Sequence, residues 1–239
     1  MRVVAIPAPL PAKPSASVIV GIELPWTAAT RAGRIEFAIV AIDQQGTTRA
    51  NVRFTTDFAA AEGSFSSWTR TGSRIDVPPG EYHVRVAAVG DDHSQGSVFT
   101  EVSVPAFDAE LGVGGLSLGA PSSSAITAAD RLRSVLTLIQ LTTNQIPRTA
   151  IAAQLPIKVS AKAALNPMTI VASLVRSDGD RFIIDRVTSP ARTYARAGGE
   201  VYRVAIPQAL APGAYSVRVE TTLNGRTVLR ELPFVVLPR

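Results

Sequence analysis

Two histidines, His83 and His93, are the side chains best suited to proton transfer or metal binding near neutral pH. His93 directly follows Asp91 and Asp92, and an imidazole beside two carboxylates is an ordinary set of metal ligands. The surrounding segment, 91–96, is also typical of a solvated hairpin loop, in which aspartate, serine and glycine provide the turn geometry. Because no acidic cluster has the spacing of a metal-binding loop, we interpret 91–96 as a hairpin loop and expect no metal ligands there.

The other signatures of catalysis or cofactor binding are weak. Asp178 and Asp180 lack the further acidic ligands of a calcium loop. A serine hydrolase would need one of the two histidines as its base, and no Gly-x-Ser-x-Gly motif accompanies either of them. The glycines of 112–115 lack the lysine and the strand-to-helix context of a phosphate loop. Paired carboxylates for glycoside hydrolysis are not excluded, but the acids fall mostly in turns and on polar strand positions. We therefore expect no catalytic residue, no cofactor and no metal, and predict that the protein is not an enzyme.

The two tryptophans, Trp26 and Trp68, are the candidates for contact with a sugar, because aromatic rings stack on sugars in carbohydrate-binding sandwiches. Trp68 follows Phe65 at a spacing that turns it toward a core, which is the commoner place for a tryptophan in a sandwich. Trp26 follows Leu24 and Pro25 at the end of a predicted strand, so we expect it to be the more exposed of the two. Trp26 is therefore the one residue that we single out for ligand contact.

The charge pattern argues against nucleic acid and membrane as partners. The net charge of +5 comes mostly from arginine, and these arginines are interleaved with acids, as in 176–181, so they form no basic stripe with stacking aromatics. No apolar run approaches the roughly 20 residues that span a bilayer, which predicts no membrane insertion. Residues 1–7 have a single basic residue and an apolar run ended by Pro7, so we do not interpret them as a signal peptide. An export signal, if the protein has one, would lie outside this chain.

The composition is typical of a packed all-β protein without disulfides. The apolar fraction is 46%, and 17 prolines and 17 glycines interrupt the chain. Valine, isoleucine and threonine, which favour strands, are abundant. Cysteine is absent, which excludes disulfides and thiolate metal sites.

A phrase that occurs twice predicts the domain organisation. Residues 79–86, PGEYHVRV, return 133 positions later as residues 212–219, PGAYSVRV. Each copy is a Pro-Gly turn leading into a strand with tyrosine and two valines on one face, and one more strand follows each copy. A spacing of this length suits one sandwich-sized domain. Tyr82 and Tyr215 begin the repeated strands, and we expect both to be buried, with their hydroxyls bonded to nearby backbone.

Alternating apolar residues predict a series of short strands in each half of the chain. The predicted strands are 2–6, 17–24, 35–42, 49–58, 68–77, 82–89 and 98–104, then 155–163, 168–175, 182–187, 201–206, 215–223 and 227–236. We therefore predict an all-β fold made of two tandem immunoglobulin/fibronectin-III-like antiparallel β-sandwiches. The first sandwich is expected at 1–107, an interdomain segment at 108–125, in which 116–118 fit a short strand, and the second sandwich at 126–239. Residues 126–135 fit either helix or strand, and we predict a short helix or turn near 127–133, followed by a strand.

Several of these stretches resemble the region that follows the A-domain in bacterial von Willebrand factor A-domain-related proteins, which are common in Acidobacteria. The stretches that carry the resemblance are 17–24, 35–46, 77–89, 96–107, 142–144 and 211–236. The resemblance implies the C-terminal immunoglobulin-like tandem of an exported or surface protein. The A-domain's metal-ion-dependent adhesion motif, Asp-x-Ser-x-Ser, does not occur here, so the resemblance assigns no metal-binding residue.

Together these observations predict a non-catalytic structural or protein-interaction module that works outside the cytoplasm. Its expected partner is a protein, including an A-domain that would precede it in a longer chain. The alternative is a carbohydrate-binding module that uses Trp26 to contact a glycan.

Overall fold

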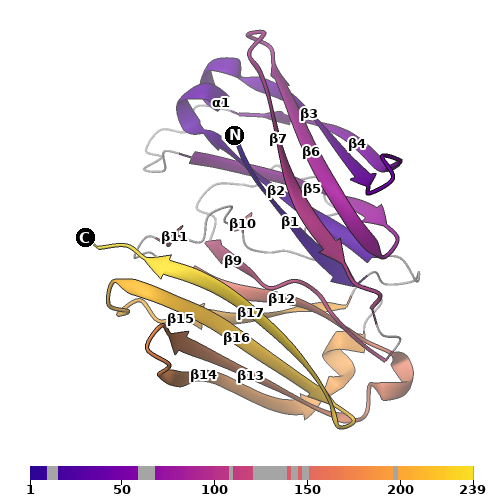
Figure 1. Ribbon diagram of the computed structural model, residues 1–239, viewed down its shortest axis with the longest axis vertical. Helices are drawn as coiled ribbons and strands as arrows, with labels where there is room; N and C mark the ends of the chain where they lie inside the picture. Colours follow the sequence, from indigo (N-terminus) through magenta and orange to yellow (C-terminus); the bar gives the residue numbers. More distant parts are fainter. Residues whose placement is uncertain are drawn as a thin grey trace. The chain divides into compact units, whose positions relative to one another are not determined.

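The computed structural model describes residues 1–9, 16–58, 68–107, 110–120, 139–140, 145–146, 151–195 and 199–238 (Figure 1). The chain divides into two compact units. Unit 1 is Met1–Pro7, Pro14–Ala106 and Ser122–Thr142, and unit 2 is Ala8–Lys13, Phe107–Pro121 and Thr143–Arg239. Both units are built almost entirely of antiparallel strands, so the predicted all-β fold of immunoglobulin/fibronectin-III-like sandwiches is confirmed. Within the described ranges, no helix is both long and apolar enough to cross a membrane.

Unit 1 is a sandwich of a three-stranded sheet, β1-β2-β5, and a four-stranded sheet, β4-β3-β6-β7. Its elements are β1 (Arg2–Pro9), β2 (Ala16–Pro25), α1 (Trp26–Ala32), β3 (Arg34–Asp43), β4 (Thr48–Asp57), β5 (Trp68–Val77), β6 (Gly80–Gly90) and β7 (Gln95–Val104).

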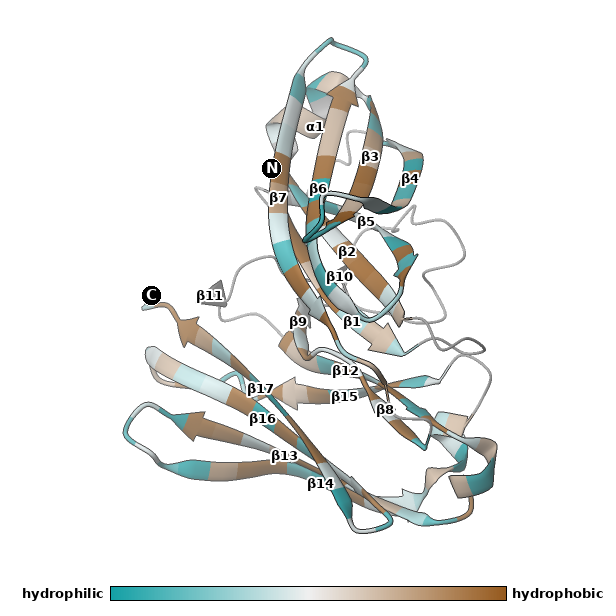
Figure 2. Ribbon diagram, turned by 45° about the vertical axis from the view of Figure 1, so that its right-hand side comes forward, coloured by the Kyte–Doolittle hydropathy of each residue, from teal (hydrophilic) through white to brown (hydrophobic). Residues whose placement is uncertain are grey.

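The core of unit 1 follows from the period-two alternation of its strands, which Figure 2 shows as alternating brown and teal segments. On β3 the inward residues Phe37 and Ile39 are fully buried, and Phe37 stacks on Phe54 of β4 with ring centroids 5.1 Å apart. On β6 the inward valines, Val84 and Val86, are also fully buried. Burying side chains of this size contributes about 1.5–3 kcal/mol each, which is what holds the two sheets together.

The short helix α1 was not predicted. It begins directly after Pro25 and ends at Gly33, whose φ of 68° is a left-handed conformation that favours glycine. The backbone N–H of Gly33 donates to the carbonyl of Ala29 and completes the last turn. Alanines between a proline and a glycine were the available signal, because alanine is the best helix former and the two flanking residues are typical helix boundaries.

Unit 2 repeats the sandwich with the sheets β9-β12-β15 and β11-β17-β16-β13-β14, and β8 also pairs with β12. Its elements are β8 (Leu111–Val113), β9 (Ser117–Ala120), β11 (Gln145–Ile146), β12 (Ile151–Val159), η1 (Ala161–Ala163), β13 (Pro167–Arg176), β14 (Arg181–Pro190), η2 (Ala191–Ala195), β15 (Glu200–Ile206), β16 (Gly213–Leu223) and β17 (Arg226–Val236). A two-residue strand, β10, covers Ile139–Gln140.

The repeated phrase forms the same structure in both units. Gly80 pairs with Val104 at the start of the β6–β7 hairpin, and Gly213 pairs with Val236 at the start of the β16–β17 hairpin. The β16–β17 turn is Asn224-Gly225, both with positive φ, as the Asn-Gly signal predicts for a tight hairpin.

Tyr82 and Tyr215 are buried corner residues, as predicted. Their exposed fractions are 4% and 7%. The Tyr82 hydroxyl donates to the carbonyl of Pro78 at 2.8 Å, and the Tyr215 hydroxyl donates to the carbonyl of Ala211 at 3.0 Å. Each bond reaches back four residues and fixes the turn that leads into the repeated strand.

The segment assigned to the interdomain region contributes strands to unit 2. Both β8 and β9 lie within 108–125, and both pair antiparallel with β12. Leu111, Val113 and Leu118 are buried, which explains why this stretch is more apolar than a free linker. The predicted helix or turn near 127–133 lies outside the described residues. The strand predicted at 155–163 is displaced: β12 ends at Val159, and the Ser160 hydroxyl accepts from the N–H of Ala163 to begin η1.

Candidate binding surface

The histidines and their neighbouring acids belong to the β6–β7 hairpin. His83 is exposed on β6, with its Nδ1 3.6 Å from Oε1 of Glu101 on β7. His93 lies in the turn with a φ of 63°. Asp92 accepts hydrogen bonds from the hydroxyl and the N–H of Ser94, and the bond from the hydroxyl lowers the pKa of its carboxyl. The predicted hairpin loop is therefore present but shorter, at 91–94, because Gln95 and Gly96 already belong to β7, and the Asp92 carboxylate bonds within the turn.

The second acidic pair also shapes a turn. The Asp178 carboxylate accepts from the N–H of Asp180 at 3.2 Å and lies 3.3 Å from Nε of Arg176. This is the β13–β14 connection that the Asp-Gly sequence predicted. Throughout the described part of the chain, no three histidine, aspartate or glutamate side chains come together in a set that could hold a metal ion.

The aromatic candidates are only partly described. Trp26 opens α1 and Trp68 opens β5, but the side chains of both lie outside the described residues. The predictions that Trp26 contacts a ligand and that Trp68 is a core residue therefore stay predictions. The glycines of 112–115 begin in β8, and the N–H of Gly114 donates to the carbonyl of Pro156, so their local role is strand pairing.

One buried polar contact closes a side of the unit 2 sandwich. The Tyr202 hydroxyl on β15 donates to the Asp185 carboxylate on β14 at 2.5 Å. Burial raises the pKa of the Tyr202 phenol, and the bond to Asp185 raises it further, so the phenol stays a protonated donor. Burial, with nearby Glu200 and Asp185, likewise raises the pKa of Tyr194. This arrangement holds two edge strands together, and its sequence signal was only a tyrosine within an alternating strand.

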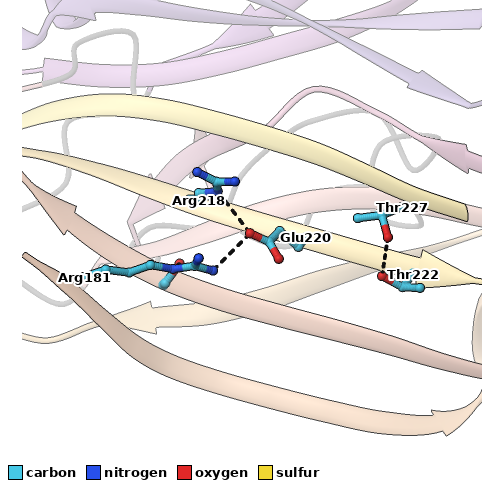
Figure 3. Close-up of polar contacts among 6 residues, drawn as sticks. Arg181, Arg218, Glu220, Thr222 and Thr227 are labelled. Carbon is cyan, nitrogen blue, oxygen red and sulfur yellow. Dashed lines mark hydrogen bonds and ion pairs between the residues drawn. The ribbon is translucent and has the colours of Figure 1, made fainter. Parts of the chain in front are cut away.

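On the outer face of the β17-β16-β13-β14 sheet of unit 2, polar side chains bond to one another (Figure 3). Glu220 on β16 accepts from Arg181 at 3.0 Å and from Arg218 at 3.1 Å. Thr222 and Thr227 share a hydroxyl hydrogen bond of 2.8 Å across the β16–β17 hairpin. The charged side chains in these contacts are therefore already paired with one another.

The equivalent face of unit 1 exposes a large aromatic ring at its edge, whereas the apolar side chains exposed on the outer face of unit 2, Ile183 at 57% and Leu229 at 40%, are aliphatic. Phe99 of β7 is 69% exposed and Val89 of β6 is 50% exposed. Val40 and Ile42 of β3 lie on the same face and are half-buried. We call this surface the Phe99 face and define it as the outward side chains of β3, β6 and β7: Glu36, Ala38, Val40, Ile42, His83, Arg85, Ala87, Val89, Ser97, Phe99 and Glu101.

Charges border the Phe99 face without being strongly paired within it. Arg85 lies directly opposite Phe99 in the β6–β7 ladder and donates to the hydroxyl of Ser97 at 3.3 Å. Glu36 is 3.9 Å from Arg53 of β4, and both side chains are mostly exposed. Exposed apolar side chains next to accessible charges are a common composition of a protein-binding surface.

The alternation along β7 is a sequence signal for the exposure of Phe99. Val98, Thr100 and Val102 are the inward residues of β7, so a phenylalanine between them must point outward. A large aromatic residue on the wrong side of an alternating strand is therefore the feature that identifies this surface.

Comparison with known proteins gives little further guidance. No family model matches the chain, and no curated protein is significantly similar to it. Among solved structures, the chain is similar to the β-glucuronidase of Parabacteroides merdae at 10% sequence identity and a TM-score of 0.32. That similarity covers 92% of this chain and 27% of the glucuronidase chain. A likeness at this level carries no conclusion about activity.

Proposed function

We propose that this protein is a non-catalytic protein-interaction module that binds its partner through the Phe99 face. The observation that carries the proposal is the exposure of Phe99 and Val89 on a regular sheet, at 69% and 50%. Exposed apolar groups of this size on a rigid surface lower the free energy of association when a partner covers them, by roughly 25 cal/mol per Å² of apolar area buried.

The charges around the face define the chemistry of the partner. Arg85 lies beside Phe99, and Glu36 and Glu101 lie farther along the same sheet. A complementary partner presents an apolar patch with a carboxylate opposite Arg85 and basic groups opposite the two glutamates. The contact surface is a flat sheet, so we expect the partner to be a folded protein.

The context that we propose is an exported protein in which this tandem follows an A-domain. The resemblance of the strand sequences to von Willebrand factor A-domain-related proteins supports this context, and the absence of cysteine is compatible with it. The alternative function is carbohydrate binding, in which Phe99 or Trp26 would stack on a sugar ring. Sequencing upstream of the codon for Met1 tests the context, because an in-frame A-domain is expected there.

A cross-linking experiment tests the proposed function. A photoreactive phenylalanine analogue at position 99, in the protein expressed in its source organism, should cross-link to a different protein. The same analogue at Leu229, which is 40% exposed on β17 of unit 2, is the matched control and should give no such product. Equal products at both positions, or none at position 99, would refute the proposal. Retention on insoluble polysaccharide that Phe99→Ser abolishes would instead establish the carbohydrate-binding alternative.

A further inference from the structure

Strand β7 forms the edge of the four-stranded sheet in unit 1, and its outward backbone groups can be assigned. The N–H of Gly90 donates to the carbonyl of Ser94 at 2.8 Å, which makes Gly90 and Ser94 a hydrogen-bonded position of the ladder. In an antiparallel ladder bonded and non-bonded pairs alternate, so the even-numbered residues of β7 bond to β6. The N–H and C=O groups that point to the free edge therefore belong to Gln95, Ser97, Phe99, Glu101 and Ser103.

The equivalent strand of unit 2, β17, has a protected edge. Residue pairing places Pro233 of β17 at the position that Glu101 occupies in β7, because each lies three residues before the valine that pairs with the glycine of the repeated phrase. Proline has no N–H to offer, and edge strands commonly carry it for this reason. The end of β17 is covered as well, because Gln145 and Ile146 of β11 pair in parallel with Val235 and Val236.

Other edges in the described part of the chain carry further protective features. The β3–β4 pairing has a register shift between Ala41 and Ile42, and the β13–β14 pairing has one between Ala172 and Ser173. Such irregularities bend an edge away from a flat pairing surface. Strand β7 pairs with β6 without a shift along its whole length, and it contains no proline and no lysine. Its edge is therefore suited to accept another strand.

We infer that β7 pairs antiparallel with β7 of a second copy of this chain, across a two-fold axis centred on Phe99. A two-fold axis perpendicular to the sheet keeps the outer face of both copies on the same side. In the register centred on Phe99, each N–H and C=O group that points away from β6, from Gln95 to Ser103, bonds to the second copy. It places Phe99 against Phe99 of the second copy, and Ser97 against Glu101 of the second copy.

Charge complementarity supports this register. Glu101 is the one charged residue within β7, and the register places it away from Glu101 of the second copy. The Arg85 guanidinium already reaches the hydroxyl of Ser97, at 3.3 Å. Because Ser97 lies opposite Glu101 of the second copy, Arg85 meets that carboxylate, and the symmetry repeats the ion pair. A register centred on Glu101 would instead oppose two like charges.

The pairing joins two four-stranded sheets into one continuous sheet with two Phe99 faces side by side. It concerns the edge of β7, and the partner proposed for the face is a separate contact, although both involve Arg85 and Glu101. Dimerisation would stand if the face bound no other protein, and the face could bind a partner if the chain were a monomer. Cross-linked products of the two kinds differ in mass, so each proposal can fail alone.

Sedimentation velocity on the full chain tests the inference, at concentrations from about 1 µM to about 1 mM, the range of weak protein association. A concentration-dependent dimer is expected. Glu101→Pro copies into β7 the residue that protects β17, removes one edge N–H and should raise the dimer dissociation constant about tenfold. Leu229→Lys, on β17 of unit 2, serves as the surface control and should leave the constant unchanged.

A charge exchange tests the register without adding a proline. Arg85→Glu alone and Glu101→Arg alone should each raise the dissociation constant about threefold or more, because like charges then face each other. The double variant should restore it to within about twofold. Far-UV circular dichroism confirms that each variant is folded.

Hydrogen exchange locates the contact. The edge amides of Ser97, Phe99 and Glu101 should become protected as concentration rises, whereas those of Val98 and Thr100 should be protected throughout. A chain that stays monomeric at all concentrations would overturn the inference. So would a dimer that leaves the edge amides exchanging freely, or edge protection that arises only with a different protein.

Discussion

The two units share a fold and a register but present different chemistry on the outer faces of their larger sheets. In unit 1 the face carries exposed Phe99 and Val89, and its acid–base contacts are long, as with Glu36 and Arg53 at 3.9 Å. In unit 2 the face carries Glu220 held by two arginines at about 3.0 Å, beside hydroxyl pairs. The two faces thus differ in an exposed aromatic ring with loosely paired charges in unit 1, against tightly paired charges beside exposed aliphatic groups, Ile183 and Leu229, in unit 2.

The difference extends to the last strand of each unit. Glu101 of β7 and Pro233 of β17 hold equivalent positions at the sheet edge, and among the described strands it is β17 that has a further strand paired with its end. The repeated phrase, 79–86 and 212–219, is nearly the same in both units, because its inward side chains must fill the core of each sandwich. Outward and edge residues are free of that constraint, and this is where functional differences between similar folds arise.

The largest expected effect concerns the tyrosine corner that each unit has, at Tyr82 and at Tyr215, and the loss of stability should be similar in both units. Tyr82→Ala and Tyr215→Ala should each cost about 3–5 kcal/mol, as for other large aromatics in cores. The Tyr215 ring also stacks on Phe234 at 5.7 Å, so its loss should cost about 1 kcal/mol more. Both tryptophans of the chain belong to unit 1, so their fluorescence in denaturant titrations measures the unfolding of unit 1. Hydrogen exchange measures the stability of unit 2.

Phenylalanine variants separate the ring from the hydroxyl. Tyr82→Phe and Tyr215→Phe should each cost about 1 kcal/mol, because each removes one hydrogen bond to a backbone carbonyl. A cost near zero for either alanine variant would mean that the two corners are not equivalent, and would break the comparison between the units.

The next effect should appear in unit 2 alone. Arg230 of β17 donates to the carbonyls of Val113 and Gly114 at 2.8 and 2.9 Å, and so ties β17 to the connection between β8 and β9. Arg230→Met should cost about 2 kcal/mol, because it removes charged donors and leaves carbonyls unsatisfied. Amides of β8 and β9 should then exchange faster while those of unit 1 do not change. Unchanged exchange in β8 would show that strand pairing with β12 alone holds this segment.

Sequence patterns predicted the strands well because each sandwich buries one side of each strand. The repeated phrase located the β6–β7 and β16–β17 hairpins. The tyrosine and the valines at alternate positions correctly predicted which side of β6 and β16 faces the core. The interdomain segment was predicted less fully. A short strand was expected at 116–118, where β9 covers Ser117–Ala120, but β8 was missed because a three-residue strand leaves too short an alternation to recognise. Their pairing with β12 depends on contacts far apart in sequence.

The candidate surface was harder to predict than the fold. Attention to histidines, carboxylates and tryptophans selected residues such as Asp92 and Asp178, whose polar groups are used in turns. Phe99 belongs to no chemical motif, and its importance lies in the side of the sheet on which it falls. Whether an edge is open is also a property of the whole sheet, so β7 could be compared with β17 only once the strand order was known.

The smallest effect is a difference in acid sensitivity at a pair of equivalent positions. Asp43 of β3 pairs with Tyr82, and Arg176 of β13 pairs with Tyr215. The Asp43 carboxylate accepts from the N–H groups of Thr47 and Gln45 and from Arg49, and the bond from Thr47 is the main cause of its lowered pKa. A carboxyl whose pKa is lower in the folded state stabilises that state above its ordinary pKa of 3.8, and this contribution is lost as the pH falls through the lowered value.

Unit 1 should therefore lose stability between about pH 4 and pH 2 through this group, whereas unit 2 carries arginine at the equivalent position and has no such carboxyl there. Thermal melts followed by tryptophan fluorescence should show the loss, and Asp43→Asn should lower the melting temperature at pH 7 while flattening its fall toward pH 2. Asp57→Asn, at an exposed carboxylate of β4, is the control and should leave the slope as it is. If Asp43→Asn and Asp57→Asn flattened the acid slope equally, the sensitivity would come from general charge, and the turn around Asp43 would not distinguish the two units.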